Sequence, residues 1–285
     1  MRWLVTGSAG MLGYDVVELL RAAGEEVTAA PRAELDITDP AAVDAAVPGH
    51  DVVVNCAAWT AVDDAETAED AALRINGEGP RVLAEAVARH GGRLVQVSTD
   101  YVFDGAATTP YPEDAPAAPA SAYGRTKAAG EQAVRAALPD RHLVVRTAWL
   151  YGAHGGCFPR TIARVARERS SVDVVEDQVG QPTWTRDVAD LVLRLVRADA
   201  PAGTYHATSE GQGSWFDFAR AVVAAAGLDP EIVHPTTSAA FVRPAPRPAY
   251  SVLGHDALRR AGVEPIGDWL ARWQQAADSV LGQSG

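Results

Sequence analysis

Short apolar runs alternate with longer stretches of helical spacing up to about residue 150. The runs at residues 3–6, 26–30, 51–56, 94–98 and 143–146 have the composition of buried strands. Between them, apolar residues recur every three to four positions in stretches that begin near Met11, Pro40, Ala65 and Tyr123. Strands that alternate with helices in this way predict a parallel sheet joined by right-handed crossovers.

The pattern is looser beyond Tyr151. Residues 158–169, 185–197 and 214–226 have the spacing of helices, residues 172–175 and 204–206 that of short strands, and a last helix begins near Gly267. The expected fold class is therefore α/β, with a doubly wound, Rossmann-like parallel sheet and a smaller mixed α/β C-terminal lobe. We assign residues 1–150 to a dinucleotide-binding domain, with return segments from the C-terminal half, and residues 151–285 to a substrate-binding lobe.

Glycines mark the turn after the first strand. Gly7, Gly10 and Gly13 form a GxxGxxG pattern between a strand and a helix. Glycine lets the backbone turn tightly and approach a pyrophosphate that lies on the helix N-terminus. An ordinary tight turn has the same glycines, but the position at the first strand favours a dinucleotide.

Residues after the second strand bear on which dinucleotide is bound. An NAD-selective site usually has a carboxylate about 20 residues past the glycines. Here Pro31 and Arg32 follow the strand, which favours the 2′-phosphate of NADPH, with NADH tolerated. A solvated loop charge is the alternative for Arg32. Asp36 and Ile37 are expected to bracket the adenine.

Composition narrows the class of protein. The chain has 285 residues, 47% of them hydrophobic, and a formal net charge of −12. That charge argues against nucleic acid or an anionic membrane as a partner. Cys56 and Cys157 do not form a disulfide framework or a metal site, so we read both as reduced thiols. No apolar stretch approaches the length of a membrane span and no cleavable signal is evident, so the cytoplasm is expected.

Candidate chemistry lies around residue 123. Tyr123 and Lys127 are four residues apart on a predicted helix and so share one face. A nearby ammonium is expected to lower the pKa of the phenol and ease proton exchange with a substrate oxygen. Thr99, at the end of a buried strand, is placed to hydrogen-bond the same oxygen. These residues and the glycine turn together indicate a carbonyl reductase.

Two proline-rich segments are candidate loops over the site. Residues 105–122 lead directly into Tyr123 and form either a lid or a passive connector. Residues 243–250 contain Arg243 and Arg247, which suit bidentate contact with a diphosphate. A surface linker is the alternative for this second segment.

Together these motifs resemble the extended short-chain dehydrogenase/reductase superfamily, through the glycine pattern, Thr99 and the Tyr123/Lys127 pair. A narrower resemblance, to the dTDP-4-dehydrorhamnose reductases, covers nearly the whole chain. It rests on the runs at residues 55–63, 97–105, 146–152, 180–183 and 243–245. The run at 97–105 is far more specific than the glycine pattern.

The resemblance implies NADPH-dependent reduction of the 4-keto group of dTDP-4-dehydro-L-rhamnose to dTDP-L-rhamnose. It makes Tyr123 the proton donor, Lys127 the ligand of the nicotinamide ribose, Thr99 the partner of the ketone oxygen, and Asp100 and Trp149 sugar contacts. The cofactor-lining residues that it implies are Gly10, Met11, Leu12, Asp36, Ile37, Ala57, Ala58, Trp59, Thr60 and Val62.

Other functions remain open. A reductase of another dTDP-deoxysugar, such as dihydrostreptose of an antibiotic pathway, shares these motifs, and so does a non-catalytic regulatory subunit. A 4,6-dehydratase typically has a Thr-Asp-Glu run, whereas Tyr101 follows Asp100 here. An epimerase would retain its dinucleotide. The expected oligomeric state is a monomer or a homodimer, with no metal assigned.

Overall fold

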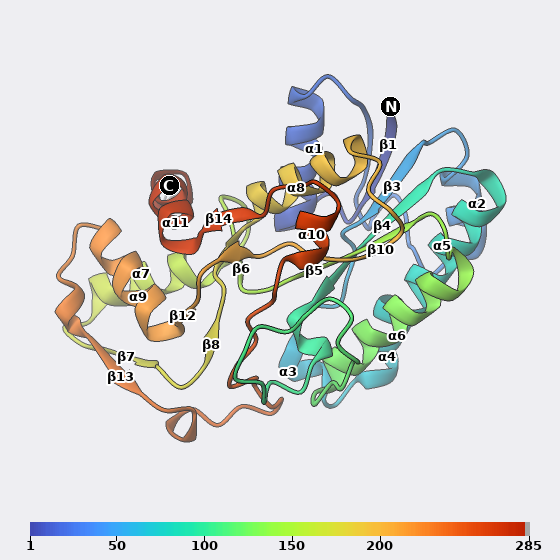
Figure 1. Ribbon diagram of the computed structural model, residues 1–285. Coiled ribbons are helices and arrows are strands. Elements are labelled where there is room, and N and C mark those ends of the chain that lie inside the picture. The colour runs from blue at the N-terminus through green and yellow to red at the C-terminus, as the bar shows by residue number, and fades with distance from the viewer. Residues whose placement is uncertain (283–285) are drawn as a thin grey trace.

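A six-stranded sheet organises the molecule (Figure 1). The computed structural model describes residues 1–282. Every neighbouring pair in the sheet is parallel. From edge to edge the strands are β10 (Gly203–His206), β5 (His142–Thr147), β4 (Arg93–Thr99), β3 (Val52–Asn55), β1 (Arg2–Thr6) and β2 (Glu26–Ala30). Each lies within one residue of its predicted position, so the predicted doubly wound parallel sheet is confirmed.

Helices cover both faces of the sheet, as its apolar sequence requires. On one face α1 (Met11–Ala22) packs against α8 (Thr185–Arg197). On the other lie α2 (Pro40–Ala46), α5 (Gly79–His90) and α6 (Ala122–Ala137) (Figure 1). Alternating residues of β1 separate accordingly, because Trp3 and Val5 join the core with α1 and α8, whereas Leu4 joins the core with α5.

The C-terminal half returns to this sheet. Both α8 and β10 follow residue 151 in the chain, and α10 (Asp256–Arg260) adds Leu258 to the same core. The large core is therefore built from both halves of the sequence.

A smaller lobe has its own core (Figure 1). Its three helices are α7 (Phe158–Glu168), α9 (Trp215–Ala225) and α11 (Trp269–Leu281). Four short strand pairs complete it or join it to the sheet domain: β6 (Leu150–Tyr151) with β9 (Thr183–Trp184), β7 (Val172–Val175) with β13 (Val233–Thr236), β8 (Val179–Gly180) with β12 (Gly213–Ser214), and β11 (Ser209–Glu210) with β14 (Ile266–Asp268). The predicted mixed α/β character of this lobe is confirmed.

The helix predicted from Ala65 is wrong in detail. The chain forms α3 (Val62–Ala65), α4 (Glu69–Leu73), a π-helical turn η1 (Arg74–Glu78) and then α5. The wide turn lies where an α-helix would require Pro80 to donate a hydrogen bond to the carbonyl of Asn76, which proline cannot do. A Cβ on Gly130 of α6 would lie 2.1 Å from that carbonyl oxygen, so the two helices are in close contact here.

The segment 105–122 is anchored away from the cleft described below. Tyr111 N donates to Val252 O, and its hydroxyl donates to Asp104 at 2.6 Å. The Tyr111 ring stacks on Phe103 with centroids 4.2 Å apart. None of residues 105–122, all of which the structure describes, borders the cleft. The geometry therefore favours the passive connector over the lid.

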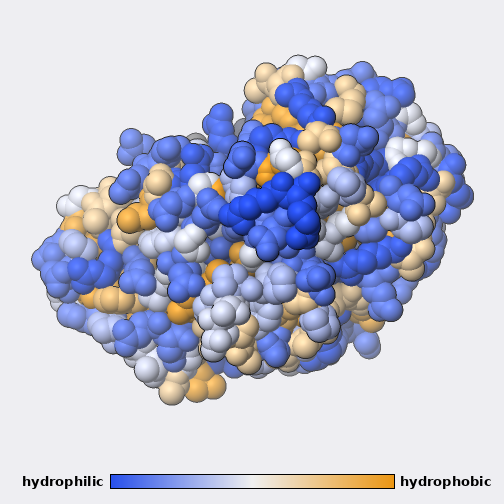
Figure 2. Space-filling model, in the orientation of Figure 1, coloured by the Kyte–Doolittle hydropathy of each residue, from blue (hydrophilic) through white to orange (hydrophobic). Residues whose placement is uncertain are grey.

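The surface in this orientation is mainly hydrophilic, with hydrophobic residues scattered over it (Figure 2). The described part of the chain also contains three 3₁₀ turns, η2 (Asp100–Val102), η3 (Pro230–Ile232) and η4 (Ser238–Ala240). Within residues 1–282, no helix has the length and apolar character needed to cross a membrane.

Candidate active site

A cleft of about 920 Å³ opens at the carboxyl ends of β1, β3, β4 and β5. Ligands of open α/β sheets bind at this edge. The structure brings most of the predicted site residues together here: Gly7, Gly10, Met11, Leu12, Gly13, Arg32, Asp36, Ile37, Ala57, Ala58, Trp59, Thr60, Val62, Thr99, Asp100, Tyr123, Lys127 and Trp149.

The glycine turn is packed so closely that side chains are excluded. Gly7 has φ +63°, and a Cβ there would lie 2.6 Å from Ala57 N. A Cβ on Gly13 would lie 2.3 Å from Gly7 O. Helix α1 begins after Gly10, which supplies no side-chain cap. The first N–H groups of α1 thus remain available to an anion in the cleft.

Two arginines lie near the predicted adenine end. Arg32 and Arg74 both border the cleft and are exposed. Hydrogen bonds from Thr38 lower the pKa of Asp36, and the two guanidiniums lower it further. Arg74 was not anticipated, because it belongs to the π-helical turn and is distant in sequence from Arg32.

Thr99 ends β4 beside a buried acid. Its hydroxyl donates to Asp100 at 2.9 Å and accepts from Tyr101 N at 3.3 Å. Burial raises the pKa of Asp100 to about 6, against the opposing hydrogen bonds of Ser251 and Thr99. Thr99 is thereby held in one orientation at the strand end.

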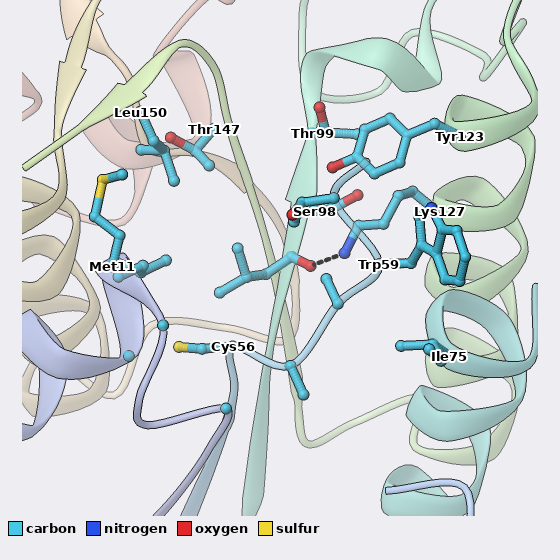
Figure 3. A pocket seen from close by; sticks show the side chains of 18 of the residues that line it. Met11, Cys56, Trp59, Ile75, Ser98, Thr99, Tyr123, Lys127, Thr147 and Leu150 are labelled. Carbon is cyan, nitrogen blue, oxygen red and sulfur yellow. Dashed lines mark hydrogen bonds between the residues drawn. The ribbon is translucent and has the colours of Figure 1, made fainter. Parts of the chain in front are cut away.

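Tyr123 and Lys127 point from one face of α6 toward the end of β4 (Figure 3). Both side chains are buried, and Lys127 Nζ donates to Val97 O at 2.7 Å. The helix approaches η2 closely, since a Cβ on Gly124 would lie 2.1 Å from Tyr101 O. Thr147 and Leu150 lie across the cleft from this pair (Figure 3).

The predicted effect of the ammonium on the phenol is wrong in this structure. Burial raises the pKa of Tyr123, and the Asp100 carboxylate raises it further, against a hydrogen bond with Thr99. Lys127 instead bonds Val97 O, and burial lowers the pKa of Lys127 to about 8. Tyr123 is therefore a protonated acid at neutral pH, the form that can donate a proton.

Two buried amides hold the loop between β3 and α3. Asn76 accepts from Trp59 N at 2.8 Å and donates to Trp59 O and to the Thr126 hydroxyl, both at 3.1 Å. Asn55 accepts from Ala57 N at 3.1 Å. Asn76 thus joins this loop to the helix of Tyr123 and Lys127. Its position on a helix face gave no sequence signal of that role.

Comparison with known proteins identifies the family of the chain. The family model described as RmlD substrate binding domain matches residues 1–282. The chain belongs to this family. It is 53% identical to a probable dTDP-4,6-dihydroxy-2-methyloxan-3-one 4-ketoreductase of Streptomyces antibioticus, over 99% of this chain and 96% of the relative. It is 50% identical to dTDP-4-dehydrorhamnose reductase of Streptomyces griseus, over 100% and 95% of the two chains.

A solved structure agrees with the family assignment. The crystal structure of dTDP-4-dehydrorhamnose reductase from Bacillus anthracis in complex with NADP superposes with a TM-score of 0.93. The two proteins share 35% identity, over 96% of this chain and 98% of the other. The sequence resemblance to the dTDP-4-dehydrorhamnose reductases is thereby confirmed.

Two residues that the sequence analysis predicts to contact the substrate, Arg243 and Arg247, lie outside the cleft. Arg243 donates to Asp63 Oδ2 at 2.6 Å and Arg247 to Asp63 Oδ1 at 2.9 Å, while Ala245 N also donates to that carboxylate. Neither arginine borders the cleft, although both are among the described residues. Their contact with a diphosphate remains a prediction. The geometry does not favour it, because both guanidiniums already bind the Asp63 carboxylate.

Aromatic residues form the opposite wall. Trp149 has φ +48°, in the left-handed region that non-glycine residues rarely adopt. Its ring stacks on Trp215 with centroids 3.7 Å apart and an interplanar angle of 8°. Both rings border the cleft. Trp215 was predicted only as part of a helix, because its contact with Trp149 depends on tertiary structure.

Proposed function

We propose that the protein uses NADPH to reduce the 4-keto group of dTDP-4-dehydro-L-rhamnose, giving dTDP-L-rhamnose. The observation that carries the proposal is the convergence of Thr99, Tyr123 and Lys127 in the cleft that also holds the glycine turn. The 50% sequence identity to a dTDP-4-dehydrorhamnose reductase, over 100% of this chain, supports the reaction class.

The cleft fits a dinucleotide. The turn at Gly7 leaves no room for side chains, and the uncapped start of α1 presents free N–H groups to a pyrophosphate. Arg32 and Arg74 offer two guanidiniums to a 2′-phosphate, which favours NADPH over NADH. The relative from Bacillus anthracis, solved with NADP, supports this choice.

The side chains divide the work of the reaction. NADPH, when bound, supplies the hydride that the carbonyl carbon accepts. Tyr123 gives its phenolic proton to the carbonyl oxygen as negative charge develops there. The Thr99 hydroxyl donates to Asp100 in the structure, and it turns this donor to the same carbonyl oxygen when the sugar is bound. Lys127 binds the nicotinamide ribose, and its hydrogen bond to Val97 O holds the ammonium at the end of β4.

A second substrate has support of its own. The relative from Streptomyces antibioticus, named as a 4-ketoreductase of another dTDP-sugar, is 53% identical, against 50% for the dTDP-4-dehydrorhamnose reductase from Streptomyces griseus. The overall identity therefore does not separate dTDP-4-dehydro-L-rhamnose from the substrate that the name of the other relative gives. For this chain, reduction of either 4-keto sugar would use Thr99, Tyr123 and Lys127.

A coupled assay tests the proposal. Purified protein is given NADPH and each of several dTDP-4-keto-6-deoxysugars, and product stereochemistry is read by NMR. We expect the highest kcat/KM with dTDP-4-dehydro-L-rhamnose. Turnover only of another sugar would select the second substrate, and no NADPH oxidation with any of them would select the regulatory subunit.

We also infer a monomer or a homodimer in the cytoplasm. Cys56 and Cys157 are both free thiols, which suits a reducing compartment. Sedimentation velocity measures the first inference and cell fractionation the second.

A further inference from the structure

The two stacked tryptophans connect the two parts of the molecule. Trp149 follows β5, whose last residue Thr147 lies in register with Thr99 of β4. Trp215 is the first residue of α9 in the smaller lobe. The stack therefore brings a ring from the lobe to the wall of the cleft that faces the proposed catalytic groups.

Trp215 is held firmly at its helix N-terminus. The Ser214 hydroxyl accepts from Asp217 N at 3.0 Å, and the Asp217 carboxylate accepts from Ser214 N at 2.9 Å, forming a capping box. Phe158 packs against Trp215 with ring centroids 4.5 Å apart. With its backbone and one side fixed, Trp215 offers Trp149 a rigid stacking partner.

Gly180 leaves room for the Trp149 ring. A Cβ built on Gly180 would lie 2.6 Å from Cε2, 2.7 Å from Cζ2 and 2.9 Å from Nε1 of Trp149. No real contact is so short, so any side chain at residue 180 must displace the indole. Thr183 N also donates to Trp149 O at 3.3 Å, which holds the backbone near the same strand pair.

We propose that Trp215 and Gly180 are specificity-determining residues that act by fixing the Trp149 indole at the sugar end of the cleft. This inference rests on the proposed function. With one face of Trp149 stacked on Trp215, the remaining ring surface is a rigid apolar wall. Such a wall accommodates the C–H groups and methyl of a 6-deoxysugar, whereas a hydroxyl placed against it loses water without gaining a polar partner.

Gly180→Ala gives the sharpest test, because the chain contains a matched control. Gly213 pairs with Gly180 across β8 and β12. A Cβ on Gly213 would lie 3.0 Å from Trp269 Cζ2, and Trp269 belongs to the core of the lobe. Both substitutions therefore add a methyl group to the same strand pair and crowd a tryptophan ring. Only the ring of Trp149 borders the cleft.

We expect Gly180→Ala to raise the dissociation constant of the dTDP-sugar about 10-fold, since an aromatic contact of this kind is worth about one order of magnitude in affinity. The dissociation constant of NADPH should stay the same, and Gly213→Ala should leave both constants near wild type. Equal effects of the two variants on sugar binding, or no effect of either, would overturn the proposal.

Trp215 variants separate specificity from stability. Trp215→Ala should raise the sugar dissociation constant and reduce the difference in affinity between one dTDP-sugar and another. Trp215→Phe should retain most of the affinity and most of the discrimination, because a ring still stacks on Trp149. A lower Tm for Trp215→Ala with unchanged sugar affinity would make Trp215 a purely structural residue.

Calorimetry with dTDP-sugars keeps the two proposals apart. If the wild type binds a dTDP-sugar but does not reduce it, the proposed function fails, and the comparison of Gly180→Ala with Gly213→Ala still decides the role of the stack. If the wild type binds no dTDP-sugar, both proposals are overturned.

Discussion

The two walls of the cleft differ in chemistry. The wall formed by β4 and α6 carries the hydroxyl of Thr99, the phenol of Tyr123 and the ammonium of Lys127, all buried and able to exchange hydrogen bonds or protons. The wall toward the smaller lobe presents Trp149 and Trp215, whose rings stack on one another. The groups that we propose act on the ketone lie on one side, and the stacked indole rings that shape the space lie on the other. We infer that reactivity and sugar selection are separate properties of the two walls.

The largest effect should follow removal of the proposed acid. Tyr123→Phe deletes one oxygen from the wall formed by β4 and α6, called the reactive wall below. The value of kcat should therefore fall roughly 100-fold or more, the scale of a lost general acid. The dissociation constant of NADPH should not change. The control is Tyr250→Phe, at a tyrosine outside the cleft, and steady-state kinetics measure both variants. Near-normal turnover of Tyr123→Phe would remove the phenol from the mechanism.

Lys127 gives the same wall a pH dependence. Burial lowers its pKa to about 8, so the folded protein loses the ammonium as the pH rises through about 8, whereas the unfolded chain keeps it to about 10.4. The dissociation constant of NADPH should therefore increase above pH 8, by up to about 10-fold per pH unit. Fluorescence titrations from pH 6.5 to 10 measure it. A profile as steep in Lys127→Met as in the wild type would assign the titration to another group.

Cofactor choice should respond to Arg32 and Arg74, which belong to neither wall. Removing either guanidinium should weaken NADPH binding about 10-fold, the loss of one charge-assisted contact of about 1.4 kcal/mol, and leave NADH binding nearly unchanged. Dissociation constants of both cofactors for Arg32→Ala and Arg74→Ala provide the measurement. An equal loss for NADPH and NADH would show that these residues do not read the 2′-phosphate.

The smallest effect should come from Asp63, which lies outside the reactive wall. Burial raises the pKa of Asp63, but hydrogen bonds from Ala245 and Arg243 lower it on balance. Asp63→Asn should cost about 1 kcal/mol of unfolding free energy by urea titration and change kcat little. Arg243→Ala should cost less, because its side chain is 59% exposed. A loss of turnover comparable with that of Tyr123→Phe would join this segment to the active site.

The reactive wall could be predicted from sequence because its information is local. Tyr123 and Lys127 are one helical turn apart, so periodicity placed their side chains on one face. Thr99 ends an apolar run, which placed it at the end of a strand, and the family resemblance joined it to the pair. The glycine turn and the strands of the parallel sheet followed from the same reasoning. The effect of Lys127 on the phenol was wrong because burial, which depends on the complete fold, outweighs it.

The wall toward the smaller lobe, formed by Trp149 and Trp215, could not be predicted in the same way. Trp149, Gly180 and Trp215 come from three separate segments, and only tertiary structure brings them together. The assignment of Arg243 and Arg247 met the same limit, because their partner Asp63 lies far away in sequence. Asn76 and Arg74 were missed since the helix there contains a π-turn, which shifts the faces that a regular helix would show.

The most direct test of the separation of the two walls is the ratio of kcat/KM for two dTDP-4-keto-6-deoxysugars that differ in stereochemistry. It is measured for the wild type, Tyr123→Phe and Gly180→Ala. The predicted result is that Tyr123→Phe lowers both values by the same factor and keeps the ratio, whereas Gly180→Ala changes the ratio several-fold. A ratio that shifts in Tyr123→Phe and stays constant in Gly180→Ala would contradict the assignment of chemistry to one wall and selection to the other.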